Sequence, residues 1–266
     1  MTATGQTWNA ADYAQHSSAQ LQWAEELLGK LRLRGDEAVL DIGSGDGKIT
    51  ARIADDVPRG RVLGIDRSPD MVRFAREVFP ASAHPNLEFR QMDARAIQLP
   101  RRVDVAFSNA TLHWVDDHPA MLAGVRGALT PGGRVLFQMG GRGCADGMLE
   151  VVEQVRRRPR WRAHFEGFVL PYHFHGPDDY QVRLAGAGLT PVRLELIPKD
   201  MQHEGARGLT GWLRTTWFPF TDRVPVESRE AFLDEVVETY LAAHPLDADG
   251  KTHVDMVRLE VEAYAG

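Results

Sequence analysis

Short apolar segments alternate with segments of helical periodicity between residues 38 and 139, and this alternation limits the possible folds more than any other feature. The apolar segments are AVLDI (38–42), RVLGID (61–66), LEFRQM (87–92), VDVAFSN (103–109) and RVLFQM (134–139). Short apolar runs separated by helices are typical of buried strands in a parallel sheet. The alternation predicts an α/β fold, with a doubly wound parallel sheet that carries helices on both faces.

The second half of the chain is less regular. PVRLELI (191–197) and VDMVRLEVEAY (254–264) are expected to be two further strands, because apolar residues recur in them with little interruption. The residues between these strands are mostly helical in pattern, with a long amphipathic piece that contains Phe232, Val236 and Tyr240. A helical stretch between two late strands predicts a cap over the carboxyl edge of the sheet.

The composition argues against several classes of function. A formal net charge of -6 disfavours a general binder of nucleic acid or of anionic membranes. The single cysteine, Cys144, supports neither a disulfide framework nor a cysteine-based zinc site. The first 15 residues lack the basic start and apolar core of a signal peptide, and no window of about 18 apolar residues occurs. We therefore expect a cytoplasmic protein.

A glycine-rich stretch, DIGSGDGKIT (41–50), follows the first predicted strand and opens a helix. A dinucleotide-binding loop needs Gly-x-Gly-x-x-Gly, but Lys48 occupies the sixth position here. A phosphate-binding NTPase loop needs four residues between its first glycine and Gly-Lys, and Gly43 is one residue too close. The stretch therefore favours a nucleoside ligand without a phosphate chain, with Lys48 as an exposed residue of the first helical turn.

Polar side chains lie at the ends of the first four predicted strands: Asp41, Asp66, Asp93 and Asn109. The carboxyl ends of parallel strands meet at one edge of a sheet, so these side chains are expected to face one crevice. A carboxylate after the second strand can accept hydrogen bonds from both ribose hydroxyls. A carboxylate with an adjacent backbone N–H can bind the amino group and a ring nitrogen of adenine. The set predicts a nucleoside site.

This pattern resembles motif I and the following motifs of the class I S-adenosylmethionine-dependent methyltransferases. The resemblance implies a seven-stranded Rossmann-like sheet of order 3-2-1-4-5-7-6, with the last strand antiparallel. It also implies the cofactor S-adenosylmethionine, with S-adenosylhomocysteine as its product. The matched cofactor-binding positions are Tyr13, Trp23, Asp41, Gly43, Ser44, Gly45, Asp46, Asp66, Arg67, Met71, Asp93, Ala94 and Asn109.

Three segments narrow the resemblance: WNAADYAQHSSAQLQWAEELL, SNATLHWVDDHPAML and LTPGGRVLFQM. They are similar to the trans-aconitate methyltransferases and to the juvenile hormone acid methyltransferases of insects, which methylate carboxylates of small molecules. By this resemblance, Gln20 and Trp114 hold the acceptor carboxylate. An amide N–H and an indole N–H are neutral donors, and they orient a carboxylate without quenching its nucleophilicity as a lysine would.

His113 has two possible roles. It is either a general base with a pKa near neutrality or a hydrogen-bonding wall of the acceptor site. A carboxylic acid with a pKa of about 4 is already ionised at pH 7, so its oxygen can attack the methyl group without a base. A hydroxyl acceptor would need one. We therefore favour the wall, and group His113 with Gln20 and Trp114 as the residues that act on the acceptor.

Further acceptor-binding candidates lie in the second half of the chain. Tyr172, Arg214 and Trp217 are expected to bind the acceptor, Arg214 either by pairing with a carboxylate or only as part of a structural ion pair. His164, His173 and His175 are expected to line or flank the acceptor pocket, and no metal is predicted. RRRPRWR (156–162) is expected to be a solvated helix end.

The sequence therefore predicts an enzyme that transfers a methyl group to a small molecule, by in-line displacement on a carboxylate oxygen. The alternatives are methylation of a natural-product hydroxyl or of a prenyl diphosphate carbon, and a cofactor-binding protein without turnover. We expect neither a nucleic-acid nor a membrane partner, and a monomer or homodimer. Three parts are expected: an N-terminal helical segment over the cofactor (1–34), the cofactor-binding core (35–140), and a half that completes the sheet and carries the acceptor-binding cap at about 145–180 and 205–245 (141–266).

Overall fold

The computed structural model describes the backbone of residues 18–266 and the side chains from residue 23 onward. The prediction for Tyr13 lies outside the described residues. Gln20 lies in the helix Ser18–Leu31 (α2), and its side chain is also outside the described part. None of the helices within residues 18–266 is long and apolar enough to cross a membrane.

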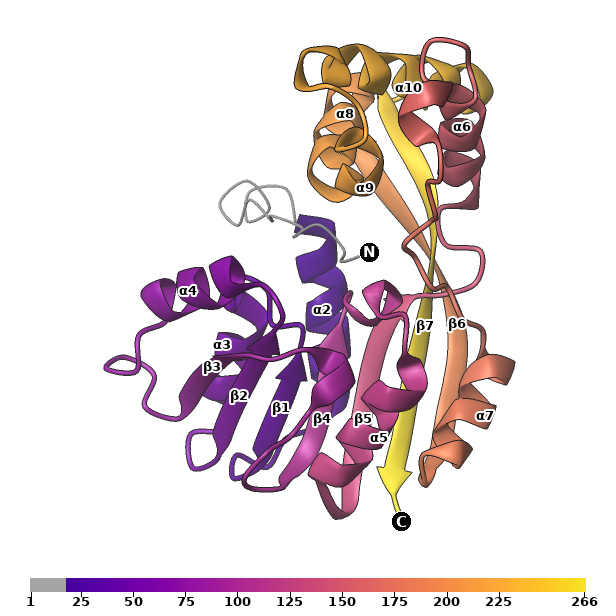
Figure 1. The fold of residues 1–266 in the computed structure, drawn as a ribbon. Coiled ribbons are helices and arrows are strands. Elements are labelled where there is room, and N and C mark those ends of the chain that lie inside the picture. The colour runs from indigo at the N-terminus through magenta and orange to yellow at the C-terminus, as the bar shows by residue number, and fades with distance from the viewer. Residues whose placement is uncertain (1–17) are drawn as a thin grey trace. The chain divides into compact units, whose positions relative to one another are not determined.

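Seven strands form one sheet of order β3-β2-β1-β4-β5-β7-β6 (Figure 1). The strands are β1 (Ala38–Ile42), β2 (Arg61–Asp66), β3 (Leu87–Gln91), β4 (Val103–Asn109), β5 (Leu129–Gly140), β6 (Leu189–Glu204) and β7 (Lys251–Ala265). Neighbours among the first five strands pair in parallel, whereas β5 and β7 pair antiparallel. The predicted fold class and strand order are confirmed.

Helices α2, α3 (Lys48–Asp56) and α4 (Pro69–Val78) cover one face of the sheet, and α5 (His118–Ala128) and α7 (Pro177–Gly186) cover the other. The remaining longer helices are α6 (Asp146–Arg156), α8 (Gly205–Thr216) and α10 (Arg229–Ala243). Consecutive residues of β1 point to opposite faces, so Val39 packs with α2, α3 and α4, and Leu40 packs with α5 and α7. The continuous apolar runs of the strands follow from this burial on both faces.

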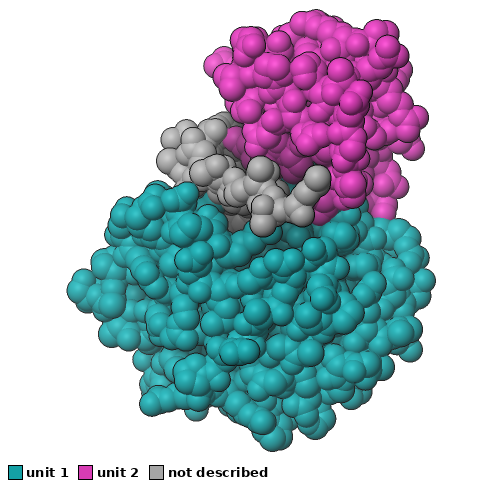
Figure 2. All heavy atoms as spheres, in the orientation of Figure 1, with its two compact units in different colours: residues 1–142, 172–197, 258–266 teal, residues 143–171, 198–257 magenta. Residues whose placement is uncertain are grey.

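The chain divides into two compact units (Figure 2). The first, called the sheet unit, comprises residues 1–142, 172–197 and 258–266. The second, called the helical unit, comprises residues 143–171 and 198–257 and contains α6, α8, α10 and the short helix α9 (Phe218–Thr221). Residues 172–180, which were grouped with the cap in the prediction, belong to the sheet unit because α7 packs against α5.

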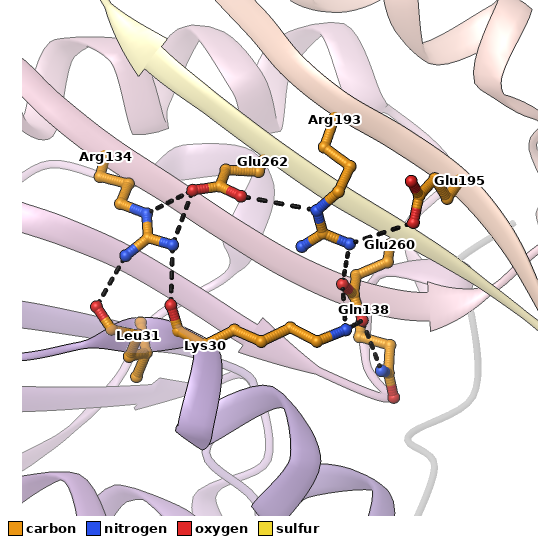
Figure 3. A network of polar contacts seen from close by, with 8 residues as sticks. All are labelled: Lys30, Leu31, Arg134, Gln138, Arg193, Glu195, Glu260 and Glu262. Atoms are coloured by element: carbon orange, nitrogen blue, oxygen red, sulfur yellow. Dashed lines mark hydrogen bonds and ion pairs between the residues drawn. The ribbon is translucent and has the colours of Figure 1, made fainter.

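An ionic network fixes α2 to the sheet (Figure 3). Glu260 of β7 is only 1% exposed, and it accepts hydrogen bonds from Lys30 at 2.7 and 2.9 Å and from Gln138 at 3.2 Å. Arg193 of β6 also binds Glu260. Arg134 of β5 pairs with Glu262 and donates to the carbonyl oxygens of Lys30 and Leu31, at the carboxyl end of α2. A cation at this end also complements the helix dipole.

Candidate active site

The conformation of the glycine loop after β1 requires glycine at several positions. Gly43, Gly45 and Gly47 have φ angles of +79°, +52° and +86°, a region that favours glycine. The N–H groups of Gly43 and Ser44 donate to the carbonyl of Ile65 in β2, at 2.7 and 3.0 Å. A Cβ built on Gly43 would lie 2.1 Å from Cγ2 of Thr111, so only glycine fits there.

Lys48 begins α3, as predicted, and its side chain is exposed. Its ammonium pairs with Asp46 at 3.3 Å, and its backbone N–H donates to Asp46 at 3.2 Å. Asp46 is buried, and its carboxylate accepts a hydrogen bond from a backbone N–H in the first turn of α3. Lys48 therefore has a local structural partner.

Asp66 connects the end of β2 to the glycine loop. Its two carboxylate oxygens accept backbone hydrogen bonds from Gly45 at 3.0 Å and from Ser68 at 2.8 Å. Burial raises the pKa of Asp66, while these hydrogen bonds and the nearby Arg67 oppose the rise. Each oxygen can accept a second hydrogen bond, so the carboxylate retains the capacity to bind a pair of hydroxyls.

Asp41 lies beneath the loop and is 2% exposed. Its carboxylate accepts a hydrogen bond of 2.6 Å from the hydroxyl of Thr50 in α3. Burial, together with the nearby charge of Asp66, raises the pKa of Asp41 to about 7. Its described contact is therefore internal, between β1 and α3.

Asp93 is the N-cap of a short 3-10 helix, Ala94–Ala96, and accepts a hydrogen bond of 2.9 Å from the Arg95 N–H. The Arg95 guanidinium binds the same carboxylate at 2.6 Å and lowers its pKa. Arg67 is exposed, and Met71 is buried in the first turn of α4.

Direct contacts join these strand ends. Gly45 binds Asp66, and the N–H of Met92 after β3 donates to the Asp66 carbonyl at 3.0 Å. The Thr111 hydroxyl donates to the carbonyl oxygens of Gly43 at 3.1 Å and of Asn109, the last residue of β4, at 3.2 Å. The structure therefore brings the predicted loops together at the carboxyl ends of β1 to β4.

The backbone after β4 is strained. Ala110 has a φ of +55°, although it is not a glycine, and its N–H donates to the Gln138 carbonyl at 2.8 Å. Strain of this kind is often found at functional sites. Thr111 follows directly, and the sequence reading missed it. The only sequence signal for Thr111 was its position in FSNATLHW, because its contact with Gly43 joins loops that are far apart in the sequence.

Three predicted acceptor residues lie together in the sheet unit. His113 and Trp114 belong to a 3-10 helix, Leu112–Trp114. Tyr172 lies edge-on to Trp114 with ring centroids 4.8 Å apart, and its ring is 6.3 Å from that of His113. Phe174 stacks on Tyr172 at 5.4 Å, and the N–H of His173 donates to the His113 carbonyl at 2.8 Å. These four rings, of His113, Trp114, Tyr172 and Phe174, are called the aromatic cluster below.

The His113 imidazole is neutral and has one nitrogen occupied. Its Nδ1 accepts a hydrogen bond of 3.3 Å from the Gly140 N–H, which places the proton on Nε2. Desolvation, with the charge of Arg258 as a second cause, lowers the pKa of His113 to about 3. A group of this pKa is a poor base at pH 7, but its Nε2–H is a hydrogen-bond donor.

Two predicted acceptor residues belong to the helical unit. Arg214 forms an ion pair with Glu230 through hydrogen bonds of 3.1 and 2.6 Å, on the exposed surface of that unit. Trp217 is 5% exposed and packs with Trp212 and Phe220. Their assignment to the acceptor stays a prediction.

The histidines are also distributed over both units. His164 lies in the helical unit, whereas His173 and His175 lie in the sheet unit. His175 packs on His118, a buried histidine that the sequence reading missed and whose Nδ1 is 2.7 Å from the Tyr180 hydroxyl. No group of three or more His, Cys, Asp or Glu residues within the described part of the chain could hold a metal ion.

Trp23 and Arg258 form a second feature that the sequence reading missed in part. Trp23 is buried. The Arg258 guanidinium lies over its ring, 4.6 Å from the ring centroid. Arg258 itself is 4% exposed. Its sequence signal was a charged residue in the alternating strand VRLEVE, where Arg258, Glu260 and Glu262 share one face.

Known proteins are similar to this chain in sequence. A family model described as a methyltransferase domain matches residues 39–133. A trans-aconitate 2-methyltransferase of Streptomyces coelicolor is 31% identical over 263 residues, which cover 94% of this chain and 84% of the relative. One of Rhodopseudomonas palustris is 30% identical over 266 residues, covering 96% and 98%.

A solved structure has the same fold at lower identity. Geranyl diphosphate C-methyltransferase from Streptomyces coelicolor, in complex with S-adenosyl-L-homocysteine, superposes with a TM-score of 0.55 at 18% identity, over 92% of this chain and 76% of that one. Fold, glycine loop and relatives together define an S-adenosylmethionine-dependent methyltransferase of class I. The chain belongs to the family of the trans-aconitate 2-methyltransferases.

Proposed function

We propose that this small-molecule methyltransferase transfers the methyl group to a carboxylate oxygen and so forms a methyl ester. The observation that carries the proposal is the state of His113, whose Nδ1 is occupied by the Gly140 N–H and whose pKa is about 3. A site that methylates a carboxylate needs no base, because the acceptor is ionised at neutral pH. The names of the relatives, which are trans-aconitate methyltransferases, support the same class of acceptor.

The residues present fit S-adenosylmethionine. The Ser44 hydroxyl is buried without a hydrogen-bond partner among the described residues, and a Cβ built on Gly45 would meet no atom within 4 Å. A buried hydroxyl without a partner, beside open space, is consistent with a loop that binds a polar ligand group. We assign the amino-acid end of the cofactor to Gly43, Ser44 and Gly45.

The nucleoside end of the cofactor is assigned to the following strand ends. Asp66 binds the ribose hydroxyls, and Asp93 with the N–H of Ala94 binds the adenine. Arg67, Met71 and Asn109 flank these groups. Asp41 and Asp46 act mainly by holding the loop, because their carboxylates already bind Thr50 and Lys48. Tyr13 stays a prediction for the part of the chain outside the described residues.

The aromatic cluster is assigned to the acceptor. His113 donates its Nε2–H and Trp114 its indole N–H to the reacting carboxylate, and the Tyr172 ring walls the site. By resemblance, Gln20 is a third neutral donor to this carboxylate, and its side chain lies outside the described residues. Neutral donors fix the orientation of the carboxylate and leave its charge available for attack.

When bound, the cofactor supplies an electrophilic methyl group on a sulfonium sulfur. The chain contributes alignment and exclusion of water rather than proton transfer. His113 and Trp114 orient the acceptor oxygen, and the rings of Tyr172 and Phe174 lower the local water content. No residue of the aromatic cluster needs to change its protonation state.

The test combines the enzyme with methyl-labelled S-adenosylmethionine and a panel of carboxylic acids, alcohols and prenyl diphosphates. We expect label in an acid, and we expect mild alkali to release it as methanol, because esters hydrolyse under these conditions and ethers do not. Alkali-stable label in an alcohol or a prenyl diphosphate would contradict the proposal. Cofactor binding with no labelled product from any class would support a protein without turnover.

A further inference from the structure

A buried polar pair that the proposed reaction does not use lies between helices α5 and α7. His118 is the first residue of α5, Tyr180 lies in α7, and both side chains are fully buried. Nδ1 of His118 is 2.7 Å from the Tyr180 hydroxyl oxygen. Polar groups are costly to bury in an apolar core, so a pair at this place needs an explanation.

The proton positions of the pair follow from its surroundings. Burial raises the pKa of Tyr180 above its ordinary value and lowers the pKa of His118 to about 3, so both groups are neutral at pH 7. Nε2 of His118 completes no hydrogen bond among the described residues, although the Leu112 carbonyl lies near enough to His118 to oppose the fall in its pKa. A nearby carbonyl favours a proton on Nε2, and Nδ1 then accepts the hydrogen bond from the Tyr180 hydroxyl.

On one side, the pair adjoins the 3-10 helix that carries His113 and Trp114. Leu112 begins this helix, is fully buried, and belongs to the same apolar cluster as Tyr180. Only three residues separate Trp114 from His118 along the chain. A displacement of His118 would therefore be transmitted to the 3-10 helix.

On the other side, the pair adjoins the stretch 172–176, which carries the other two rings of the aromatic cluster. The His175 ring lies edge-on to that of His118, with ring centroids 4.5 Å apart, and its centroid is 5.9 Å from that of Tyr180. Helix α7 begins directly after this stretch. The pair therefore lies between the two segments that form the aromatic cluster.

We infer that His118 and Tyr180 are positioning residues, whose hydrogen bond holds the donors of His113 and Trp114 in the orientation that the acceptor carboxylate requires. Alignment is what the chain contributes to this reaction, and small displacements of aligning groups lower the rate strongly. The inference rests on the proposed function, because it requires that the aromatic cluster orients the acceptor.

Removal of one hydroxyl tests the pair with little disturbance of packing. Tyr180→Phe deletes the hydrogen bond to His118 and keeps the ring. The indole N–H signals of the full-length protein are measured by nuclear magnetic resonance, and the Trp114 signal is assigned by its loss in Trp114→Phe. We expect Tyr180→Phe to shift the Trp114 signal by more than its line width.

The second measurement is the steady-state kinetics of methyl transfer to the acid that takes label, with trans-aconitate as the first probe. We expect Tyr180→Phe to lower kcat/KM for the acceptor about 10-fold and to change the affinity for S-adenosylhomocysteine less than about 2-fold. A purely structural role would lower the thermal midpoint without separating the acceptor from the cofactor.

Tyr240→Phe is the matched control. Tyr240 is similarly buried, and its hydroxyl donates to the His253 carbonyl at 2.7 Å within the helical unit. We expect Tyr240→Phe to lower the thermal midpoint by a similar amount and to leave both the Trp114 signal and kcat/KM unchanged.

Two variants of His118 test for rescue, and they also cover the case in which Tyr180→Phe does not fold. An asparagine amide lies near the position of Nδ1 and can keep the hydrogen bond to the Tyr180 hydroxyl, whereas a leucine cannot. We expect His118→Asn to keep kcat/KM within about 3-fold of the wild type and His118→Leu to lose about 10-fold.

An unchanged Trp114 signal in a folded Tyr180→Phe protein would overturn the inference. Equal losses of kcat/KM in His118→Asn and His118→Leu would also overturn it, and so would equal effects of Tyr180→Phe and Tyr240→Phe. A wild type that methylates no acid would instead refute the proposed function. The Trp114 signal would still decide whether the pair positions the donors, because that measurement needs no acceptor.

Discussion

The loops to which we assign the cofactor and the aromatic cluster are held together by different kinds of contact. The loops after β1, β2 and β4 are joined by short polar contacts, such as Gly45 to Asp66 and Thr111 to Gly43. The aromatic cluster is held by ring packing of Trp114 and Tyr172, and the His113 imidazole accepts a hydrogen bond from the Gly140 N–H. Hydrogen bonds require particular distances and angles between their atoms. Packed rings can be replaced by other apolar side chains of similar size at a lower cost in stability. We therefore expect substitutions in the loops to affect folding and cofactor binding, and substitutions in the cluster to affect acceptor choice.

The largest effect is expected from Gly43→Ala. The new Cβ would lie 2.1 Å from Thr111, and the φ of +79° is unfavourable for alanine. We expect a loss of about 3 kcal/mol or more in the free energy of unfolding, together with loss of cofactor binding, measured by denaturant titration and calorimetry.

Gly45→Ala is the matched control for this change. Gly45 also has a positive φ, but its Cβ would meet no atom within 4 Å. We expect a cost of about 1 kcal/mol from the backbone alone. Equal stability losses in the two variants would show that the close approach of Thr111 to Gly43 is unimportant.

The second-largest effect is expected from Asp66→Ala. The variant removes the acceptor of two backbone N–H groups and the proposed ribose ligand. We expect cofactor affinity to fall about 100-fold, which corresponds to about 2.7 kcal/mol, as measured by calorimetry with S-adenosylhomocysteine. Unchanged affinity in a folded variant would remove the ribose assignment. The preference among acceptors should stay the same, because we assign acceptor choice to the aromatic cluster and not to the loops.

The loops and the cluster also differ in how well the sequence predicted them. Asp66 ends β2, and Asp93 follows the end of β3 by two residues, so a local apolar pattern was sufficient to place both carboxylates at strand ends. Strand order followed from the resemblance, and the structure confirms it. Tyr172 and Arg258 had no such pattern. Arg258 reaches Gly140 only through the antiparallel register of β5 and β7, and that register depends on tertiary packing.

The third prediction is a pH dependence of stability at Asp41. The pKa of this carboxyl is about 7 in the folded protein, above its ordinary value of 3.8. A raised pKa means that the folded state retains the proton longer, so this contribution to stability is present below pH 4 and is lost as the pH rises to about 7. Asp41→Asn removes the titration and keeps an oxygen that can accept from Thr50. We expect its stability relative to the wild type to increase between pH 4 and pH 8, by about 1 to 4 kcal/mol.

Denaturant titrations of wild type and Asp41→Asn at pH 4, 6 and 8 measure this difference. A constant difference across the range would contradict the raised pKa. Asp93→Asn provides the opposite sign, because Arg95 lowers the pKa of Asp93. Its loss of stability is expected to be present at neutral pH and to disappear as the pH falls below about 4.

The smallest effect is expected from Arg214→Gln in the helical unit. The ion pair with Glu230 is exposed, and exposed pairs contribute less than about 1 kcal/mol to stability. Steady-state kinetics should show a change of less than about 3-fold in the acceptor KM. A rise in the acceptor KM of about 10-fold or more would support the alternative in which Arg214 binds the acceptor.

The central claim is that the enzyme methylates an ionised carboxylate without a general base, and His113→Gln tests it most directly. Glutamine keeps an N–H donor near the position of Nε2 and cannot act as a base at neutral pH. With an acid acceptor, we predict that kcat/KM stays within about 10-fold of the wild type, and that the wild-type profile is flat from pH 6 to 8. A loss of about 100-fold or more, with a wild-type inflection near pH 6.5, would contradict the claim and identify His113 as the base.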